Sequence, residues 1–317
     1  MITASTKEAM IKETAIKSVD IQGMTFFKIE NVDQMSPFFM SIVSPGNHWL
    51  FIASNGGISA GRKDAENALF PYYTVDKITE SSEETGSKTI VKVLKDEVDT
   101  WEPFSIRNGR SFRCTNNLYK SVYGNAIIFE EINHDLDLCF RYRWSSSAEF
   151  GFVKTSTIEN LADLPCSIEL LDGVQNILPQ GVGSELQNRA SNLVDAYKRN
   201  ELDAESGLAM YALSAMIVDK AEPREALKAN VVWSSGLPNS KHLLSSLQLD
   251  AFRKGEKLNE EIDIKGEKGA YFLVNNIELA AQESSSWNFI ANVNQSQSNV
   301  IRLIETINQD QSLWSKI

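Results

Sequence analysis

Alternation of apolar and polar residues is the feature that most constrains the fold of this chain. Within residues 136–144, the apolar side chains stand at every second position, and the residues between them are polar or small. A period of two places these apolar side chains on one face of a β-strand, whereas a helix would scatter them around its axis. The segment therefore predicts a strand that buries one face and leaves the other polar.

Similar strand-like runs, separated by short turns, fill the rest of the first half. The runs are residues 25–30, 38–43, 49–53, 89–95, 126–132, 150–158 and 166–171. Turns rich in Gly, Pro, Asn and Asp separate many of them, for example at residues 44–47 and 55–57. Many strands with short polar turns predict an antiparallel sandwich or barrel, and they do not favour alternating strands and helices.

The second half of the chain mixes helical and strand-like patterns. The expected elements are helices at residues 184–200, 240–253 and 298–308 and strands at 226–234 and 270–279. Residues 208–218 are apolar on both faces and fit either a helix or a central strand. The last helix has an apolar stripe of Val300, Leu303, Ile304 and Ile307, which must pack on this domain or on a following one.

Composition excludes several classes of partner. The chain has 317 residues and a net charge of -11, which argues against nucleic acid or an anionic membrane as a main partner. It has no apolar run of about 18–20 residues and no recognisable signal peptide. The three cysteines are odd in number and form no C-x-x-C pair, so we expect reduced thiols and a cytoplasmic location.

Residues 55–103 contain the side chains that most suggest a ligand. A glycine-rich turn carries Asn55, Arg62 and Asp64, and Trp101 follows in an aromatic corner. Amide, guanidinium and carboxylate groups can hydrogen-bond sugar hydroxyls, and an indole ring can stack on the face of a sugar. We therefore predict that these four residues bind carbohydrate, while each of them could equally anchor a loop.

The sequence contains no complete catalytic constellation. Residues 57–61 match the G-x-S-x-G pattern around Ser59, but the alternation of strands and helices that accompanies a nucleophile elbow is missing. The histidines, His48, His134 and His242, lie far apart and at no metal-ligand spacing. There is also no phosphate-binding glycine loop. We expect no catalytic residue, metal or cofactor in this chain.

Several short motifs resemble the N-terminal domain of the cellobiose phosphorylase family. The matching motifs are Ser44-Pro45, the Asn-Gly-Gly-Ile-Ser turn at residues 55–59, the cluster Arg62-Lys63-Asp64, and Asp-Thr-Trp-Glu-Pro at residues 99–103. Two features depart from the family pattern. Ile58 replaces an aromatic residue after the glycine turn, and residues 47–54 insert a strand between the first two motifs.

The resemblance implies a fold, a domain division and a function. It implies a mainly β, antiparallel β-supersandwich of the galactose-mutarotase type with a few helices. Residues 1–22 would form an extension or first strand, residues 23–290 the sandwich, and residues 291–317 a helical linker towards an (α/α)6 barrel that carries the catalytic acid. The chain itself would then be a non-catalytic carbohydrate-binding or structural domain of a glycoside phosphorylase-like transferase. Its partners would be an oligosaccharide, the barrel and a second copy in a homodimer.

Two alternatives remain open on the same fold. The first is a mutarotase-like or epimerase-like enzyme, for which His134 beside Asp135 is the best-placed acid or base. The second is a purely structural dimerisation domain without affinity for sugar.

Overall fold

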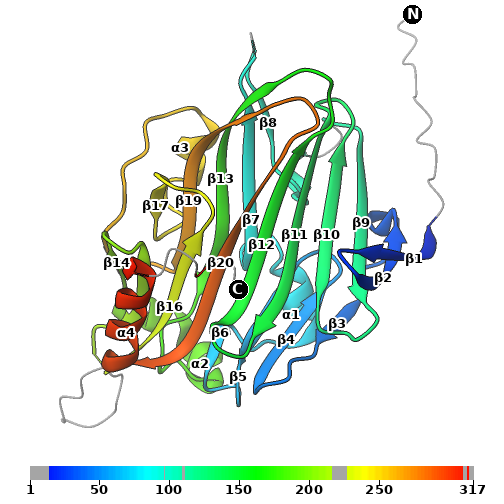
Figure 1. Cartoon of the computed structure of the whole chain (residues 1–317). Coiled ribbons are helices and arrows are strands. Elements are labelled where there is room, and N and C mark those ends of the chain that lie inside the picture. The colour runs from blue at the N-terminus through cyan, green and yellow to red at the C-terminus, as the bar shows by residue number, and fades with distance from the viewer. Residues whose placement is uncertain (1–13, 96, 109–110, 216–226, 310–312, 314–317) are drawn as a thin grey trace, which may run out of the picture.

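The computed structural model describes residues 14–95, 97–108, 111–215, 227–309 and 313. These residues fold into three antiparallel β-sheets and four α-helices. Figure 1 shows how these elements are arranged. The mainly β, antiparallel architecture predicted from the alternation of apolar residues is confirmed.

The largest sheet contains eleven strands. In spatial order they are β1 (Ala15–Ile21), β2 (Met24–Glu30), β9 (Cys114–Ser121), β10 (Ile127–Asn133), β11 (Leu138–Ser147), β12 (Gly151–Asn160), β20 (Ser284–Ser296), β16 (Lys228–Ser235), β15 (Leu208–Leu213), β14 (Lys198–Asp203) and β18 (Asp263–Lys265). Strands β9 to β12 follow one another as a meander, whereas β20 joins them from much later in the chain. This pairing of distant segments brings residues 151–160 and 284–296 side by side.

Two smaller sheets complete the β structure. The five-stranded sheet has the order β17 (Lys241–Leu243), β19 (Gly269–Leu279), β13 (Cys166–Ile177), β7 (Gly86–Val93) and β8 (Asp99–Trp101). The four-stranded sheet has the order β3 (Phe39–Ile42), β4 (His48–Ala53), β5 (Ile58–Arg62) and β6 (Ala68–Phe70).

The main core lies between the eleven-stranded and the five-stranded sheet. Phe140, Tyr142 and Trp144 of β11 are buried there in one apolar cluster with Ile168 and Leu170 of β13. These are side chains of the predicted alternating strand, so its apolar face is the inner face of the large sheet. The other face of the large sheet, which we call the outer face, carries the polar residues of the same strand.

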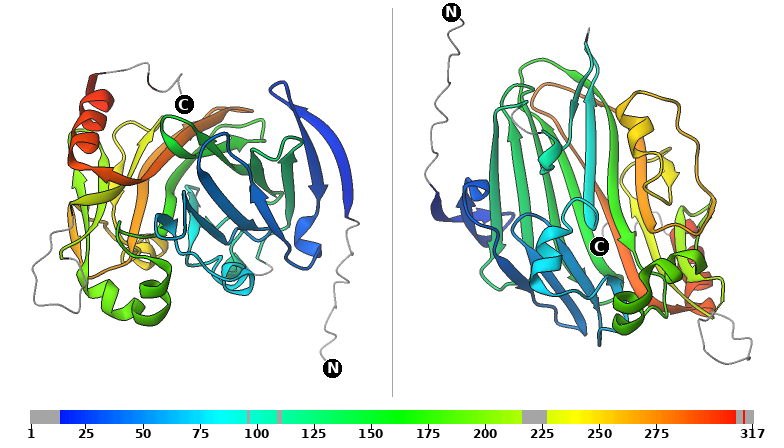
Figure 2. Two further views of the ribbon diagram at one scale, coloured as in Figure 1. Left: turned by 90° about the horizontal axis from the view of Figure 1, so that it is seen from below. Right: turned by 180° about the vertical axis from the view of Figure 1, so that it is seen from behind.

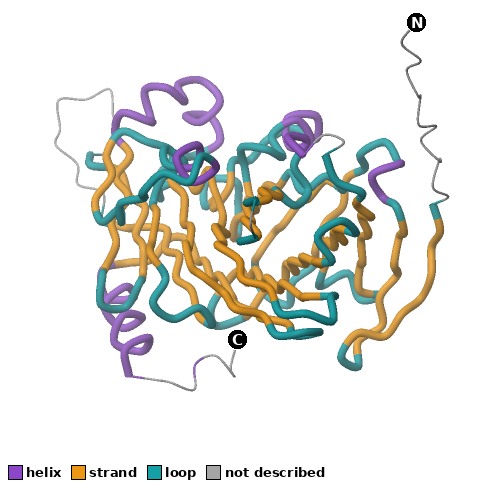
Figure 3. The backbone as a smooth tube through the Cα atoms, turned by 90° about the horizontal axis from the view of Figure 1, so that it is seen from above, coloured by secondary structure: helices purple, strands orange, loops and turns teal. Residues whose placement is uncertain are grey.

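Four helices cover the edges and outer surfaces of the sheets (Figures 2 and 3). They are α1 (Val75–Glu80), α2 (Ser184–Tyr197), α3 (Leu249–Arg253) and α4 (Gln297–Gln309). The apolar stripe of α4 packs against Val231 and Trp233 of β16 and against Ile290 of β20. The stripe is therefore covered within this chain, and it no longer argues for a following domain by itself. None of the described helices combines the length and apolar character that a membrane crossing requires.

Several expected elements differ in the structure. The helix expected at residues 240–253 is wrong, because residues 241–243 pair with β19 as β17 and only Leu249–Arg253 is helical. The ambiguous segment at 208–218 forms strand β15 over Leu208–Leu213. The expected helices at 184–200 and 298–308 are confirmed, although α2 ends at Tyr197.

The predicted division into three parts is not marked by a break in the described fold. Strand β1 pairs along its whole length with β2, and β20 runs through residue 290 to Ser296 without interruption. The linker towards a further domain therefore stays a prediction.

Candidate binding cavity on the outer face

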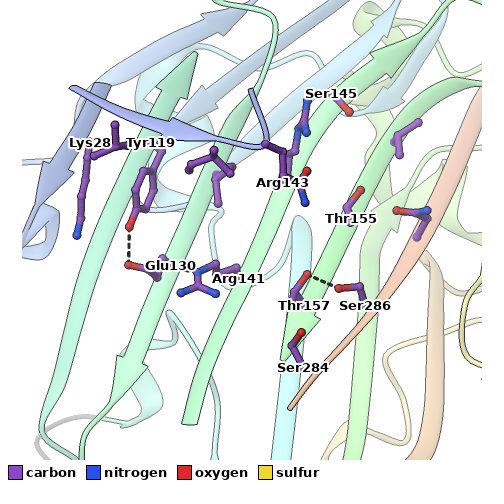
Figure 4. Close-up of a pocket in the computed structure, with 16 residues that line it drawn as sticks. Lys28, Tyr119, Glu130, Arg141, Arg143, Ser145, Thr155, Thr157, Ser284 and Ser286 are labelled. Atoms are coloured by element: carbon purple, nitrogen blue, oxygen red, sulfur yellow. Dashed lines mark hydrogen bonds and ion pairs between the residues drawn. The ribbon is translucent and has the colours of Figure 1, made fainter. Parts of the chain in front are cut away.

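A cavity with a volume of about 790 Å³ lies on the outer face of the eleven-stranded sheet. The β1–β2 hairpin forms one wall, and β9, β10, β11, β12 and β20 supply the rest (Figure 4). The residues around the cavity are Val19, Ile21, Gln22, Lys28, Tyr119, Ile128, Glu130, Arg141, Arg143, Ser145, Val153, Thr155, Thr157, Ser284, Ser286 and Asn288. Most of them carry a hydroxyl, amide or charged group.

Strand register places many of these side chains in two rows across the sheet. One row contains Tyr119, Ile128, Arg143, Thr155 and Asn288. The second row contains Asn117, Glu130, Arg141, Thr157 and Ser286. Because side chains on one face of a sheet recur at every second residue, the rows stand side by side and all point to the outer face.

Glu130 is the centre of the second row. Its Oε1 accepts hydrogen bonds from Asn117 Nδ2 and from the Tyr119 hydroxyl, both at 2.7 Å. Its Oε2 accepts from Arg141 Nε. Burial opposes ionisation of this carboxyl, but the charge of Arg141 and the three hydrogen bonds outweigh burial and lower the pKa of Glu130. Glu130 is therefore a carboxylate at neutral pH, and it is poorly suited to donate a proton.

Two of the cations at the cavity have carboxylate partners. Arg141 also donates from Nη1 to Glu159 Oε2 at 2.6 Å, so it lies between two carboxylates. Lys28 Nζ lies 3.4 Å from Glu30 Oε1 and 5.5 Å from the centre of the Tyr119 ring. These pairs fix the positions of both cations.

The wall formed by β12 and β20 carries hydroxyl groups. Thr157 Oγ1 and Ser286 Oγ lie 2.8 Å apart, and Figure 4 shows them beside Thr155 and Ser284. Hydroxyl groups can both donate and accept, so this wall can adapt to a polyhydroxylated ligand.

The four residues predicted from the sequence lie outside this cavity. Arg62, at the end of β5, donates from Nε to Asn47 Oδ1 at 2.8 Å and from Nη1 to Asn292 Oδ1 at 2.9 Å. Asp64 braces its own turn by accepting from Asn67 Nδ2 at 2.7 Å. Both residues hold loop geometry in this structure, and their role in binding sugar stays a prediction.

Asn55 and Trp101 also have structural partners. Asn55 Nδ2 donates to Thr79 O at 2.8 Å, and Asn55 borders a separate cavity of about 410 Å³. Trp101 has no exposed surface, and its indole Nε1 donates to Glu131 Oε1 at 2.7 Å. A ring in this position cannot stack on a sugar without opening the core, so the stacking role of Trp101 stays a prediction that its burial does not support.

The glycine-rich turn at residues 55–57 has a packing role in this structure. A Cβ atom on Gly57 would stand 1.9 Å from the backbone oxygen of Ile78 in α1. Gly56 has a φ of 92°, a conformation that glycine adopts most readily. The two glycines therefore let the β4–β5 turn approach α1 closely.

Catalytic arrangements considered from the sequence do not assemble among the described residues. Ser59 lies within strand β5 with no exposed surface and no hydrogen bond to its hydroxyl, so no nucleophile elbow forms. His134 Nε2 lies 2.8 Å from Thr115 Oγ1 and does not border the outer-face cavity. No group of three or more His, Cys, Asp or Glu side chains in the described part of the chain is arranged to hold a metal ion.

Sequence reasoning missed the residues of the cavity. The available signal was the polar side of the alternating strand, where Arg141 and Arg143 follow Cys139. Two arginines on the exposed side of an otherwise apolar strand indicate a charged surface. Their neighbours across the sheet, however, depend on strand pairings that the sequence does not reveal.

Several solved structures are similar to this chain, although no family profile and no curated protein matches the sequence. A bacterial glucoamylase in complex with acarbose is 10% identical with a TM-score of 0.50, over 89% of this chain and 39% of the glucoamylase. A polysaccharide lyase is 10% identical with a TM-score of 0.44, over 86% of this chain and 34% of the lyase. A galactose mutarotase-like protein from Clostridium acetobutylicum is 10% identical with a TM-score of 0.38, over 89% of this chain and 99% of that protein.

The likeness to the glucoamylase concerns the fold alone, because the identity is so low. The chain spans 34% and 39% of the length of the lyase and the glucoamylase, respectively. The fold has the predicted mainly β, antiparallel architecture, and the glucoamylase shares this fold.

Proposed function

We propose that this chain is a non-catalytic saccharide-binding module and that its ligand occupies the cavity on the outer face of the large sheet. The observation that carries the proposal is the double row of mostly polar side chains across β9, β10, β11, β12 and β20. Hydroxyl, amide, carboxylate and guanidinium groups lie together there in a cavity of about 790 Å³. Small-molecule sites are typically clefts of about 300–1,000 Å³ with a few convergent polar groups.

The side chains around the cavity favour binding over catalysis. Glycoside hydrolysis typically needs two carboxyl groups on either side of the scissile bond, and sugar epimerisation needs an acid and a base that exchange protons with the substrate. Among the described residues around the cavity, Glu130 is the one carboxylate and there is no histidine. Glu130 is itself held ionised by Arg141. We therefore propose a ligand-holding role and do not adopt the epimerase alternative.

Comparison at the level of the fold supports the class of ligand. The glucoamylase with this fold was solved in complex with acarbose. We also propose, from the motifs shared with cellobiose phosphorylases, that the module acts beside a catalytic domain in a glycoside phosphorylase-like protein. Co-purification of such a domain from the native source, followed by mass measurement of the complex, tests this part.

Isothermal titration calorimetry with maltotriose, cellotriose and a β-1,2-linked glucotriose tests the binding proposal. We expect measurable binding of at least one of them to the wild type. Thr155→Val removes one hydroxyl from the cavity with little change of shape. Because one hydrogen bond contributes about 0.5–1.5 kcal/mol, we expect an affinity roughly two- to tenfold weaker.

Thr306→Val is the matched control, because it makes the same chemical change on the exposed face of α4. We expect the control to bind like the wild type. No heat with any of the three neutral sugars at millimolar concentration, together with no heat from charged saccharides, contradicts the proposal and favours the purely structural alternative. Faster interconversion of glucose anomers in the presence of the protein contradicts the non-catalytic part.

A further inference from the structure

Arg143 differs from the other cations around the outer-face cavity in having no carboxylate partner. Glu30 pairs with Lys28, and both Glu130 and Glu159 pair with Arg141. In the described part of the chain, no carboxylate oxygen lies within 4.0 Å of the Arg143 guanidinium, and its buried Nε has no hydrogen-bond partner. The cavity therefore contains one partly buried positive charge that the described residues leave without a counter-charge.

Burial of this guanidinium has an energetic cost. Removing a charged group from water is unfavourable unless a counter-charge or hydrogen bonds replace the lost solvation. Burial lowers the pKa of Arg143, in keeping with this cost, while the side chain remains charged at neutral pH because arginine titrates far above it. A guanidinium in this position is typical of an arginine whose counter-charge is an anionic group of a bound ligand.

The neighbours of Arg143 in the same row point to the rest of that ligand. Thr155 and Asn288 follow Arg143 across β12 and β20 in direct register. Asn288 is 6% exposed, and its Oδ1 has no hydrogen-bond partner among the described residues. The row thus offers a guanidinium, a hydroxyl and an amide oxygen in sequence. A guanidinium binds a carboxylate or phosphate with two parallel hydrogen bonds, and an amide oxygen accepts a hydrogen bond from a hydroxyl.

We propose that the saccharide bound in this cavity carries an acidic group, which Arg143 binds, while ring hydroxyls meet Thr155 and Asn288. This inference rests on the proposed function, since it specifies the ligand of the same cavity. The acidic group is a carboxylate, as in a uronic acid, or a phosphate ester, as in a sugar phosphate. Both are anions with at least two oxygens that fit the fork of a guanidinium.

Pairs of ligands that differ only in charge test the inference by calorimetry. Digalacturonate and its carboxyl-reduced, neutral counterpart form one pair, and glucose 6-phosphate and glucose form the other. Inorganic phosphate serves as an anion without a sugar. We expect the wild type to bind the acidic member of at least one pair about tenfold or more tightly, because charged hydrogen bonds are the stronger ones. The preferred pair identifies carboxylate or phosphate.

Three variants assign the preference to Arg143. Arg143→Gln is expected to abolish the difference between the acidic and the neutral ligand. Arg143→Lys keeps the charge without the fork and is expected to retain only part of the difference. Arg302→Gln makes the same chemical change on the exposed side of α4 and is expected to bind like the wild type. Circular dichroism checks that each variant is folded, and if Arg143→Gln does not fold, Arg143→Lys decides.

The possible failures are distinguishable. The inference is overturned if the wild type binds the acidic and neutral members of both pairs with equal affinity and Arg143→Gln and Arg143→Lys bind them as the wild type does. The proposed function would remain intact. The inference is also overturned if inorganic phosphate binds as tightly as glucose 6-phosphate while neither digalacturonate nor its neutral counterpart binds. The site would then recognise an anion alone. Absence of binding by every saccharide contradicts the proposed function itself.

Discussion

Lys154 and Asp172 form an ion pair inside the main core, with Nζ 2.7 Å from Oδ1, and neither side chain has exposed surface. Lys154 lies on β12 and Asp172 on β13, so the pair joins the eleven-stranded sheet to the five-stranded one. Asp172 also accepts hydrogen bonds from Thr89 Oγ1 at 2.7 Å and from Trp287 Nε1 at 2.8 Å. A pair with this many partners stabilises one specific packing of the two sheets.

Lys154→Met should destabilise the protein by about 3–5 kcal/mol, because it leaves the carboxylate of Asp172 buried without its counter-charge. The double variant Lys154→Met/Asp172→Asn should recover part of this loss, since it removes the uncompensated charge. Urea denaturation measures both. Lys17→Met is the control, because Lys17 pairs with Glu30 at the surface, where such pairs contribute about 0–1 kcal/mol. Equal effects of Lys154→Met and Lys17→Met would contradict this account.

Glu130 should make stability depend on pH in the acid range. The pKa of Glu130 is lowered in the folded protein, because the charge of Arg141 and three hydrogen bonds outweigh burial. A lowered folded pKa gives stability that is present above the ordinary value of 4.5 and is lost as the pH falls through the folded pKa. Wild type should therefore exceed Glu130→Gln in stability near neutral pH, and the gap should narrow below pH 4.5. Urea midpoints across this range measure the gap, and a constant gap would argue against the ionised form.

Glu131, the next residue, should behave in the opposite way. Burial raises the pKa of Glu131, although Trp101 and the backbone of Phe104 hydrogen-bond to its two oxygens. A raised folded pKa gives stability that is present below the ordinary value of 4.5 and is lost as the pH rises through the folded pKa. The stability of Glu131→Gln should therefore rise relative to that of the wild type as the pH increases from 4.5 through the folded pKa of Glu131. The same urea titrations check this. If the stability of Glu131→Gln relative to the wild type rises as the pH falls, the pKa of Glu131 is lowered and this prediction is wrong.

Trp101→Phe should weaken the fold and leave saccharide binding unchanged. The substitution removes the indole Nε1 that donates to the buried Glu131 carboxyl, so we expect a loss of about 1–3 kcal/mol in the free energy of unfolding. Thermal denaturation and calorimetry with the same saccharides measure the two properties separately. Weaker binding at unchanged stability would instead support the stacking role that the sequence suggested.

The strands were predictable because their signal is local. In residues 136–144 each apolar residue sits two positions from the next, and the structure buries Leu138, Phe140 and Tyr142 on one face. The expected helix at 240–253 was wrong because a tertiary contact overrides the local pattern. Residues 241–243 pair with β19, and both Leu243 and Leu244 are fully buried. Neighbouring leucines that are both buried, one in a short strand and one just after it, resemble the apolar stripe of a helix in sequence alone.

The cavity was not predictable because its rows join segments that are distant along the chain. Thr157 faces Ser286, and Thr155 faces Asn288, only because β20 pairs with β12. Arg62, Asp64 and Asn55 were predicted to bind carbohydrate because they lie in or near a glycine-rich turn. Close packing of this turn against α1 requires glycines equally. The residue types indicated the class of ligand, whereas strand pairing determines which side chains lie together in a cavity.

Titration of isotope-labelled protein with a bound saccharide, followed by NMR, tests the central claim most directly. The account predicts that shift changes concentrate at Tyr119, Arg143, Thr155 and Asn288 on the outer face of the large sheet. Changes concentrated at Asn55, Arg62 and Asp64, with the outer face unaffected, would contradict it and return the binding site to the segment first suggested by the sequence.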